Sequence, residues 1–143
     1  MNNNCDALKL ENQLCFPLYA CSKEIVRKHK PYLDELDLTY TQYITMIALW
    51  ENGEINVKEL GEKLYLDSGT LTPLLKKLEG KGYITRERSK TDERNLIVRL
   101  TSSGESLKSK AAEVPKKVGA CVNIDPEKAK MLGETLYEIL NSI

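Results

Sequence analysis

The fold is decided by residues 56–101, which read NVKELGEKLYLDSGTLTPLLKKLEGKGYITRERSKTDERNLIVRLT. Leucines within this stretch recur at i, i+3, i+4 and i+7, the apolar stripe of an amphipathic helix: Leu71, Leu74, Leu75 and Leu78. Asp67 or Ser68 can cap the start of this helix, because a side-chain oxygen there accepts from the free amides of the first turn. Gly80 and Gly82 mark its end, where a residue with positive φ is often needed.

A shorter helix precedes this one. Asn56 is followed three residues later by Glu59, which is close to a capping box, and Val57, Leu60 and Leu64 then share one face. Only residues 65–67 separate the two helices, so the link is a tight turn. Two short helices joined in this way predict a helix-turn-helix.

Two strand-like runs follow the second helix. Residues 84–88 alternate like a strand, and residues 96–100 are rich in β-branched and aliphatic side chains. The charged segment 89–95 joins them. A helix-turn-helix followed by a charged hairpin predicts a winged helix-turn-helix, in a chain that is mainly α with a small β-hairpin wing.

Further helices are expected before this unit. A helix from about Leu8 to about Lys28 is expected to be kinked by Pro17, because proline removes a backbone hydrogen bond. Pro31 ends this region or starts a short turn. Thr39 or Thr41 then caps a helix that stops at residues 52–53.

The chain after the wing is also expected to be helical. Thr101 and Ser102 open a long helix that Pro115 interrupts or bends. The last helix starts at residues 125–127, where an aspartate cap, a proline and an early glutamate follow one another.

The 21 basic and 21 acidic residues cancel, so net charge gives no sign of a nucleic-acid partner. Residues 76–99 nevertheless carry eight Lys or Arg against four Asp or Glu, and a basic wing can bind phosphates. The start of the chain lacks the basic and apolar regions of a signal peptide. No apolar run approaches the roughly 20 residues that span a bilayer. We therefore expect a cytoplasmic protein with no membrane partner.

Four cysteines, Cys5, Cys15, Cys21 and Cys121, contain no C-x-x-C spacing, and His29 is the one histidine. This pattern does not favour a zinc site, so no metal and no cofactor are predicted. Cys15 and Cys21 are six residues apart on one helix, about 9 Å of rise, and cannot bridge each other.

The pair Asp92 and Arg94, with Leu100-Thr101 closing the second strand, resembles the wing signature of the MarR family of bacterial transcription regulators. Membership implies one MarR-type domain over residues 1–143, with the winged helix-turn-helix at about 54–101. It also implies a homodimer joined by helices at about 8–30 and about 102–143, and binding of a pseudo-palindromic operator in double-stranded DNA. The expected function is then that of a repressor, not an enzyme.

Candidate DNA contacts follow from position. The short side chains of Ser68, Thr70 and Thr72 let the recognition helix approach base edges in the major groove. Lys76 and Lys77 are expected to meet phosphates. Arg94 is the candidate for minor-groove insertion, with Asp92 holding its guanidinium. Arg86 and Arg88 are weaker candidates, since an exposed strand face explains them equally well.

Residues 10–20, 38–40 and 64–74 are similar to the organic hydroperoxide-sensing repressors of the MarR family. In that branch a first-helix cysteine, here Cys15, is a peroxide-reactive thiolate held by two tyrosines of the facing subunit. Tyr40 matches one of them, and His29 stands where the other belongs. Tyr19, within the matching segment, is a third candidate partner of the thiolate.

The resemblance also places Cys121 where some members carry a second cysteine, which would resolve the oxidised Cys15 as a disulfide. A small-molecule thiol is the alternative. The function predicted is a repressor that releases its operator when organic hydroperoxide oxidises Cys15. The first alternative is a MarR-type repressor that binds a small aromatic ligand without redox chemistry. The second is a thiol peroxidase, although no peroxide-activating arginine or threonine motif accompanies Cys15.

Overall fold

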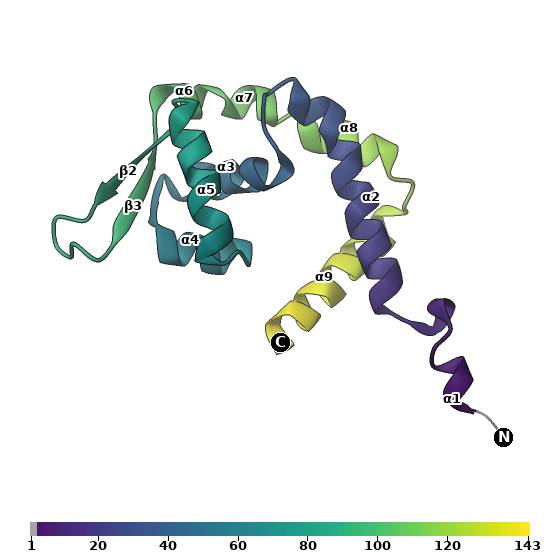
Figure 1. Ribbon diagram of the computed structural model, residues 1–143. Coiled ribbons are helices and arrows are strands. Elements are labelled where there is room, and N and C mark those ends of the chain that lie inside the picture. Colours follow the sequence, from purple (N-terminus) through teal and green to yellow (C-terminus); the bar gives the residue numbers. More distant parts are fainter. Residues whose placement is uncertain (1–2) are drawn as a thin grey trace.

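The computed structural model describes residues 3–143 and has two parts (Figure 1). Helices α3 to α5 and the wing form one part, and α2 packs against α8 in the other, with α9 following α8 (Figure 1). The elements in order are α1 (Asn3–Asp6), η1 (Leu10–Asn12), α2 (Cys15–Asp34), α3 (Tyr40–Asn52), β1 (Glu54–Asn56), α4 (Val57–Leu64), α5 (Ser68–Gly80), β2 (Ile84–Arg88), β3 (Leu96–Leu100), α6 (Ser102–Ser106), α7 (Lys108–Ala111), α8 (Val114–Cys121) and α9 (Pro126–Ser142). The winged helix-turn-helix architecture is confirmed.

Caps fix the helix-turn-helix. Asn56 Oδ1 accepts from the Glu59 amide at 2.8 Å, and Asp67 Oδ1 accepts from the Thr70 amide at 2.7 Å. Between the two helices Tyr65 adopts a left-handed conformation with φ 55°. A Cβ on Gly61 would lie 2.9 Å from the Leu66 carbonyl oxygen, so the small residue lets α4 and α5 approach closely.

The wing belongs to a three-stranded antiparallel sheet with the order β1-β3-β2. Strand β2 pairs with β3 in the register Ile84 to Leu100 and Arg88 to Leu96, as the hairpin prediction requires. Strand β1 adds Ile55 opposite Val98. The sequence analysis missed β1, because three residues between a glycine and a helix cap are too few to show an alternating pattern.

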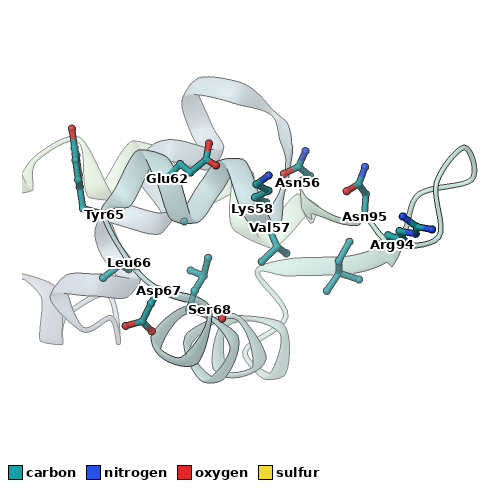
Figure 2. A pocket seen from close by; sticks show the side chains of 13 residues that line it. Asn56, Val57, Lys58, Glu62, Tyr65, Leu66, Asp67, Ser68, Arg94 and Asn95 are labelled. Carbon is teal, nitrogen blue, oxygen red and sulfur yellow. The ribbon is translucent and has the colours of Figure 1, made fainter. Parts of the chain in front are cut away.

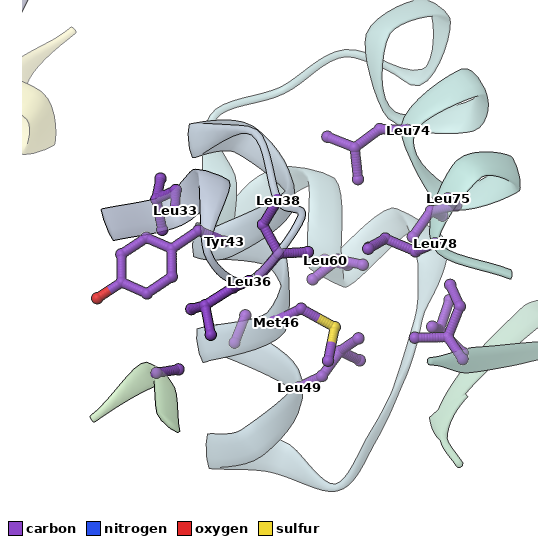
Figure 3. Close-up of a cluster of buried hydrophobic side chains, with 14 of the residues drawn as sticks. Leu33, Leu36, Leu38, Tyr43, Met46, Leu49, Leu60, Leu74, Leu75 and Leu78 are labelled. Atoms are coloured by element: carbon purple, nitrogen blue, oxygen red, sulfur yellow. The ribbon is translucent and has the colours of Figure 1, made fainter. Parts of the chain in front are cut away.

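The core lies between α3, α4, α5 and the sheet, and it continues to the carboxyl end of α2 and to α7 and α8 through Leu33, Ala111 and Val114 (Figure 3). All four leucines of the predicted α5 stripe are at most 7 % exposed. They meet Met46, Leu49 and Leu60, which are fully buried. Each such side chain contributes about 1.5–3 kcal/mol through burial, so this unit holds most of the apolar stabilisation of the chain.

Helix α2 differs from the predicted first helix. It begins at Cys15 and not near Leu8, and it continues through Pro31 to Asp34. Pro17 lies in its first turn, where a missing amide costs no hydrogen bond, so the predicted kink has no cause. Pro31 leaves the Arg27 carbonyl without its helical donor, but Arg27 is exposed and water can replace that donor.

The segment after Thr101 is divided into shorter helices than the sequence analysis predicts. Thr101 caps α6 through the Gly104 amide at 3.1 Å, but the predicted long helix is divided into α6, α7 and α8. Pro115 lies in the first turn of α8, as an interruption at this residue predicts. Asp125 caps α9 at the Lys128 amide. None of the helices described in residues 3–143 is long and apolar enough to cross a membrane.

Candidate functional site

The side of α5 that is predicted to face DNA is open. All five predicted contacts on this helix are exposed, opposite the buried leucines: Ser68, Thr70, Thr72, Lys76 and Lys77. Asp67 supplies the cap, so the Ser68 hydroxyl is not needed for it and remains available to a ligand. The amino-terminal turn of α5 thus presents small hydroxyls first and two ammonium groups one turn later.

A groove of about 770 Å³ lies between α4, the amino end of α5 and the wing (Figure 2). Asn56 and Lys58 at the amino end of α4 lie near Arg94 and Asn95 of the wing, and Asp67 and Ser68 lie on the opposite side. Tyr65 stands at the far end, 62 % exposed. Sequence reasoning missed Lys58, Tyr65 and Asn95, although Lys58 could have been found from its place in the first turn of α4, beside free amides that favour anions.

The two wing arginines of β2 have structural partners. Arg86 binds Glu79 of α5 through two hydrogen bonds, at 3.1 and 3.3 Å, and its side chain is 17 % exposed. This pair lowers the pKa of Glu79. Arg88 donates from Nη1 to the Glu93 carbonyl at 2.9 Å. Arg86 therefore fastens the wing to the recognition helix and Arg88 closes the wing loop, which explains both without DNA.

At the wing tip, Asp92 Oδ1 accepts from the backbone amide of Arg94 at 3.1 Å. The prediction that Asp92 holds the Arg94 guanidinium is therefore wrong for the free protein, because the carboxylate is used to build the turn. Arg94 is exposed and borders the groove. Asp92 thus shapes the loop that presents Arg94.

A second ion-pair cluster stiffens the sheet. Arg99 on β3 contacts Glu54 of β1 at 2.6 Å and Glu87 of β2 at 3.0 Å. The hydrogen bond to Glu54, with a smaller part from Glu87, raises the pKa of Arg99. The charge of Arg99 is therefore balanced by two carboxylates within the sheet. The wing region consequently offers fewer unpaired positive charges to a ligand than its sequence suggests.

His29 and Tyr40 lie together, but not beside Cys15. Their ring centroids are 4.9 Å apart in an edge-to-face arrangement, and Tyr43 is 6.0 Å from the His29 ring. His29 Nδ1 lies 2.8 Å from the Ile25 carbonyl oxygen. A carbonyl only accepts, so Nδ1 donates this hydrogen bond.

Cys15 is exposed at the first residue of α2. His29 lies 14 residues further along the helix, about 21 Å of rise, so neither His29 nor Tyr40 reaches Cys15 within one chain. Tyr19 is one turn away from Cys15 on the same face. Its ring is 63 % exposed and carries the Lys23 ammonium 5.5 Å from its centroid.

Cys121, the last residue of α8, is exposed and has a neighbour that the sequence did not reveal. The Tyr32 hydroxyl lies 3.6 Å from Cys121 Sγ, and Lys117 Nζ lies 5.6 Å from the Tyr32 ring centroid. The contact with Cys121 raises the pKa of Tyr32, first through the hydrogen bond and then through charge. The phenol therefore keeps its proton and can donate to the sulfur.

Comparison with known proteins shows which family this chain resembles. A family model described as transcriptional regulator SarA/Rot matches residues 27–111. The organic hydroperoxide resistance transcriptional regulator of Bacillus subtilis is 48 % identical over the whole chain and 97 % of its own length. The chain belongs to the MarR family, in the branch of the organic hydroperoxide resistance regulators. A second relative in this MarR-family branch, the regulator SarZ of Staphylococcus aureus strain USA300, is 52 % identical over 84 % of this chain and 81 % of its own length.

Solved structures of one MarR-type regulator, AbfR of Staphylococcus epidermidis, agree with this assignment. Reduced AbfR bound to DNA superposes with a TM-score of 0.82 and 33 % identity, covering 99 % of each chain. The disulfide form of AbfR has the same identity and a TM-score of 0.66, over 96 % of each chain. The TM-score of this chain is therefore higher with reduced, DNA-bound AbfR than with the disulfide form.

Proposed function

We propose that this MarR-family protein is a cytoplasmic, homodimeric repressor that releases its operator when organic hydroperoxide oxidises Cys15. One observation carries the proposal: an exposed cysteine opens helix α2 in a chain 48 % identical to a regulator named for organic hydroperoxide resistance. The relatives named above are transcriptional regulators, so we infer regulation and no enzymatic turnover.

Dimerisation is supported by apolar surface that finds no cover within the chain. Helix α9 has no buried residue, and its large apolar side chains include Met131, Leu132 and Tyr137, which are 67, 49 and 65 % exposed. Ahead of α2 and in its first turn, Leu14 and Phe16 are 70 and 42 % exposed. Several exposed large apolar side chains on both terminal regions support an interface there. A second copy of this chain, joined by these helices, covers both regions at once.

Operator binding is supported by the open face of α5 and by the groove. In a dimer, two recognition helices enter successive major grooves about one helical turn apart, so the operator is expected to be pseudo-palindromic. Ser68, Thr70 and Thr72 then face base edges, while Lys76 and Lys77 meet phosphates. The groove beside Arg94 is placed for the adjacent backbone. Arg86 and Arg88 are left out, since both are already bound.

The thiol chemistry requires the partner subunit. Since His29 and Tyr40 are too far from the Cys15 of their own chain, they can approach only the Cys15 of the other. Tyr40 then donates its hydroxyl to the thiolate. His29 differs, because its Nδ1 proton is directed to Ile25. Neutral His29 can accept the thiol proton at Nε2, and the resulting imidazolium stabilises the thiolate.

Oxidation proceeds in two balanced steps. The Cys15 thiolate attacks the terminal peroxide oxygen, the O–O bond breaks, and the alkoxide takes up a proton to leave as an alcohol. Cys15 becomes a sulfenic acid. The Cys121 thiol of the other subunit then forms the S–S bond, and the sulfenic oxygen leaves as water. In one chain this is excluded, since Cys15 and Tyr32 are about 26 Å apart along α2 while Tyr32 touches Cys121, and a disulfide needs Cα atoms within about 7 Å.

The proposal is tested by adding cumene hydroperoxide to the reduced protein on a DNA duplex selected from random sequence. We expect release of the DNA at stoichiometric hydroperoxide, and rebinding after a dithiol is added. Protein that stays bound after its Cys15 has been oxidised, as mass spectrometry would report, contradicts the proposed function.

A cavity favours the alternative of a small aromatic ligand. It has about 330 Å³, lies between α3 and α7–α8, and is mainly apolar, with Tyr43, Ile47, Trp50 and Pro115 in its wall. If this ligand class controls the protein, benzoate or salicylate will release the duplex without a redox change, and hydroperoxide will have no effect.

Replacement of Arg94 by alanine is expected to weaken duplex binding by about 1–3 kcal/mol and to reduce the salt slope by about one. The reason is loss of the one exposed arginine that borders the groove at the wing tip. The measurement is fluorescence anisotropy at several salt concentrations. Arg27→Ala on α2, which removes an exposed arginine remote from the wing, is the control. Equal effects of the two substitutions would show that the wing arginine has no specific role.

Replacement of Cys121 by serine is expected to stop formation of a covalent dimer on oxidation. Wild-type protein treated with hydroperoxide should run as a reducible dimer on a denaturing gel. The Cys121→Ser protein should stay monomeric there, still release DNA at first, and then accumulate sulfinic acid at Cys15, because no thiol resolves the sulfenic acid. Wild-type protein that remains monomeric while a small-molecule thiol is incorporated would assign resolution to that thiol.

A further inference from the structure

Lys81, directly after the recognition helix, reaches across to the corner that joins α2 to α3, residues 35–39. Its ammonium contacts the backbone carbonyl of Asp37, and it lies 3.5 Å from Asp37 Oδ2 and 3.3 Å from Gln42 Oε1. The side chain of Lys81 is only 27 % exposed. It is therefore held against the corner between α2 and α3.

The corner that receives Lys81 is anchored in the core on both sides of Asp37. Asp37 has a left-handed backbone, with φ 54°, and is flanked by the buried Leu36 and Leu38. Gln42 is 3 % exposed, and its Oε1 also accepts from the Thr39 amide at 3.0 Å, as half of the capping box of α3. One buried amide oxygen thus serves the cap of α3 and the ammonium of Lys81 together.

Two covalent connections join the helical part of the chain to the winged unit, at this corner and at Thr101. Lys81 adds a polar connection at the carboxyl end of α5, beside the packing of α2 against α3 in the common core. From these contacts we infer that Lys81 is a positioning residue that fixes the angle of the recognition helix to α2 and so sets the half-site spacing that the dimer accepts. The inference rests on the proposed binding of an operator by a dimer.

This role can be tested directly by changing the spacing between the two half-sites of the operator. Inserting one base pair between half-sites moves them apart by about 3.4 Å and rotates them by roughly 35°. A recognition helix held to the corner by Lys81 resists such a change, whereas a helix without this contact can shift farther toward the displaced half-site. Loss of Lys81 should therefore reduce discrimination between spacings, and not only affinity.

The test compares wild type, Lys81→Met, Lys81→Arg and the exposed control Lys116→Met on α8. Reduced wild-type protein first selects its duplex from random DNA, and affinities are then measured for that duplex and for versions with one base pair added or removed. Wild type and Lys116→Met should lose about tenfold or more in affinity when one base pair is added or removed, which is the scale of one unfavourable base pair in a site. Lys81→Met should lose about threefold or less, and Lys81→Arg should restore the wild-type ratio.

An unchanged ratio in Lys81→Met, whatever its absolute affinity, overturns the inference, since a phosphate contact or a stability effect weakens all duplexes alike. The melting temperature of Lys81→Met should agree with that of wild type within about 4 °C. If Lys81→Met does not fold, Lys81→Gln is measured by the same criterion. Failure of wild-type protein to select any two-fold repeated sequence would instead contradict the proposed function.

Discussion

Replacement of Cys15 by serine is expected to leave operator binding intact and to abolish its response to organic hydroperoxide. Serine keeps the shape of the side chain but cannot form a sulfenic acid. Oxidised wild-type protein should fall toward non-specific affinity, a loss of about 1,000-fold, whereas Cys15→Ser should lose less than about twofold. Fluorescence anisotropy of a labelled operator before and after cumene hydroperoxide measures both.

The matched control is Cys21→Ser. Cys21 is exposed on the same helix, six residues further along, with no role in the proposal. This variant should respond like wild type. Release of DNA by hydroperoxide from the Cys15→Ser protein would transfer the sensing function to another residue, whatever happens at Cys121.

The winged helix-turn-helix could be predicted because its signals are local. The leucine stripe of α5 and the caps at Asn56 and Asp67 each act within four residues, and the structure confirms them. The start of α2 could not be predicted in this way. Apolar residues before Cys15 continue a helical pattern, but Leu8 and Leu10 are 85 and 57 % exposed, so no packing within the chain enforces a helix there.

The candidate site was predictable where it depends on one element and not where distant segments meet. The exposed face of α5 follows from its period. The pairing of Arg86 with Glu79 could not be predicted in this way. Strand alternation shows only that a side chain lies on one face, and it does not distinguish an arginine that binds DNA from one that binds another part of the protein. Tyr32 and Cys121 are 89 residues apart, and Lys81 meets Gln42 from 39 residues away. Neither contact could be predicted from a periodic sequence pattern, because its two residues are far apart in the chain.

The base of the wing depends on a close approach at Gly104. A Cβ added there would lie 2.1 Å from the Tyr83 carbonyl oxygen and 3.2 Å from Leu100 Cδ2. That carbonyl cannot withdraw freely, because it accepts from the Thr101 amide at 3.0 Å. The carbonyl of Gly104 itself accepts from Trp50 Nε1 at 2.9 Å. Helix α6, the wing and α3 thus meet at a residue that has room for no side chain.

Gly104→Ala is therefore expected to destabilise the protein by about 3 kcal/mol, the upper range for overpacking a filled site, and to lower its Tm by roughly 10 °C. Gly119→Ala is the matched control, since a Cβ on Gly119 meets nothing within 4 Å and alanine favours a helix interior by about 0.5–1 kcal/mol. Thermal unfolding of both variants measures the difference. Because the strain acts at the base of the wing, Gly104→Ala should also weaken operator binding below its melting range. A Gly104→Ala protein that melts with wild type would mean that α6 shifts away from Tyr83 without cost, and that the wing is not held at this junction.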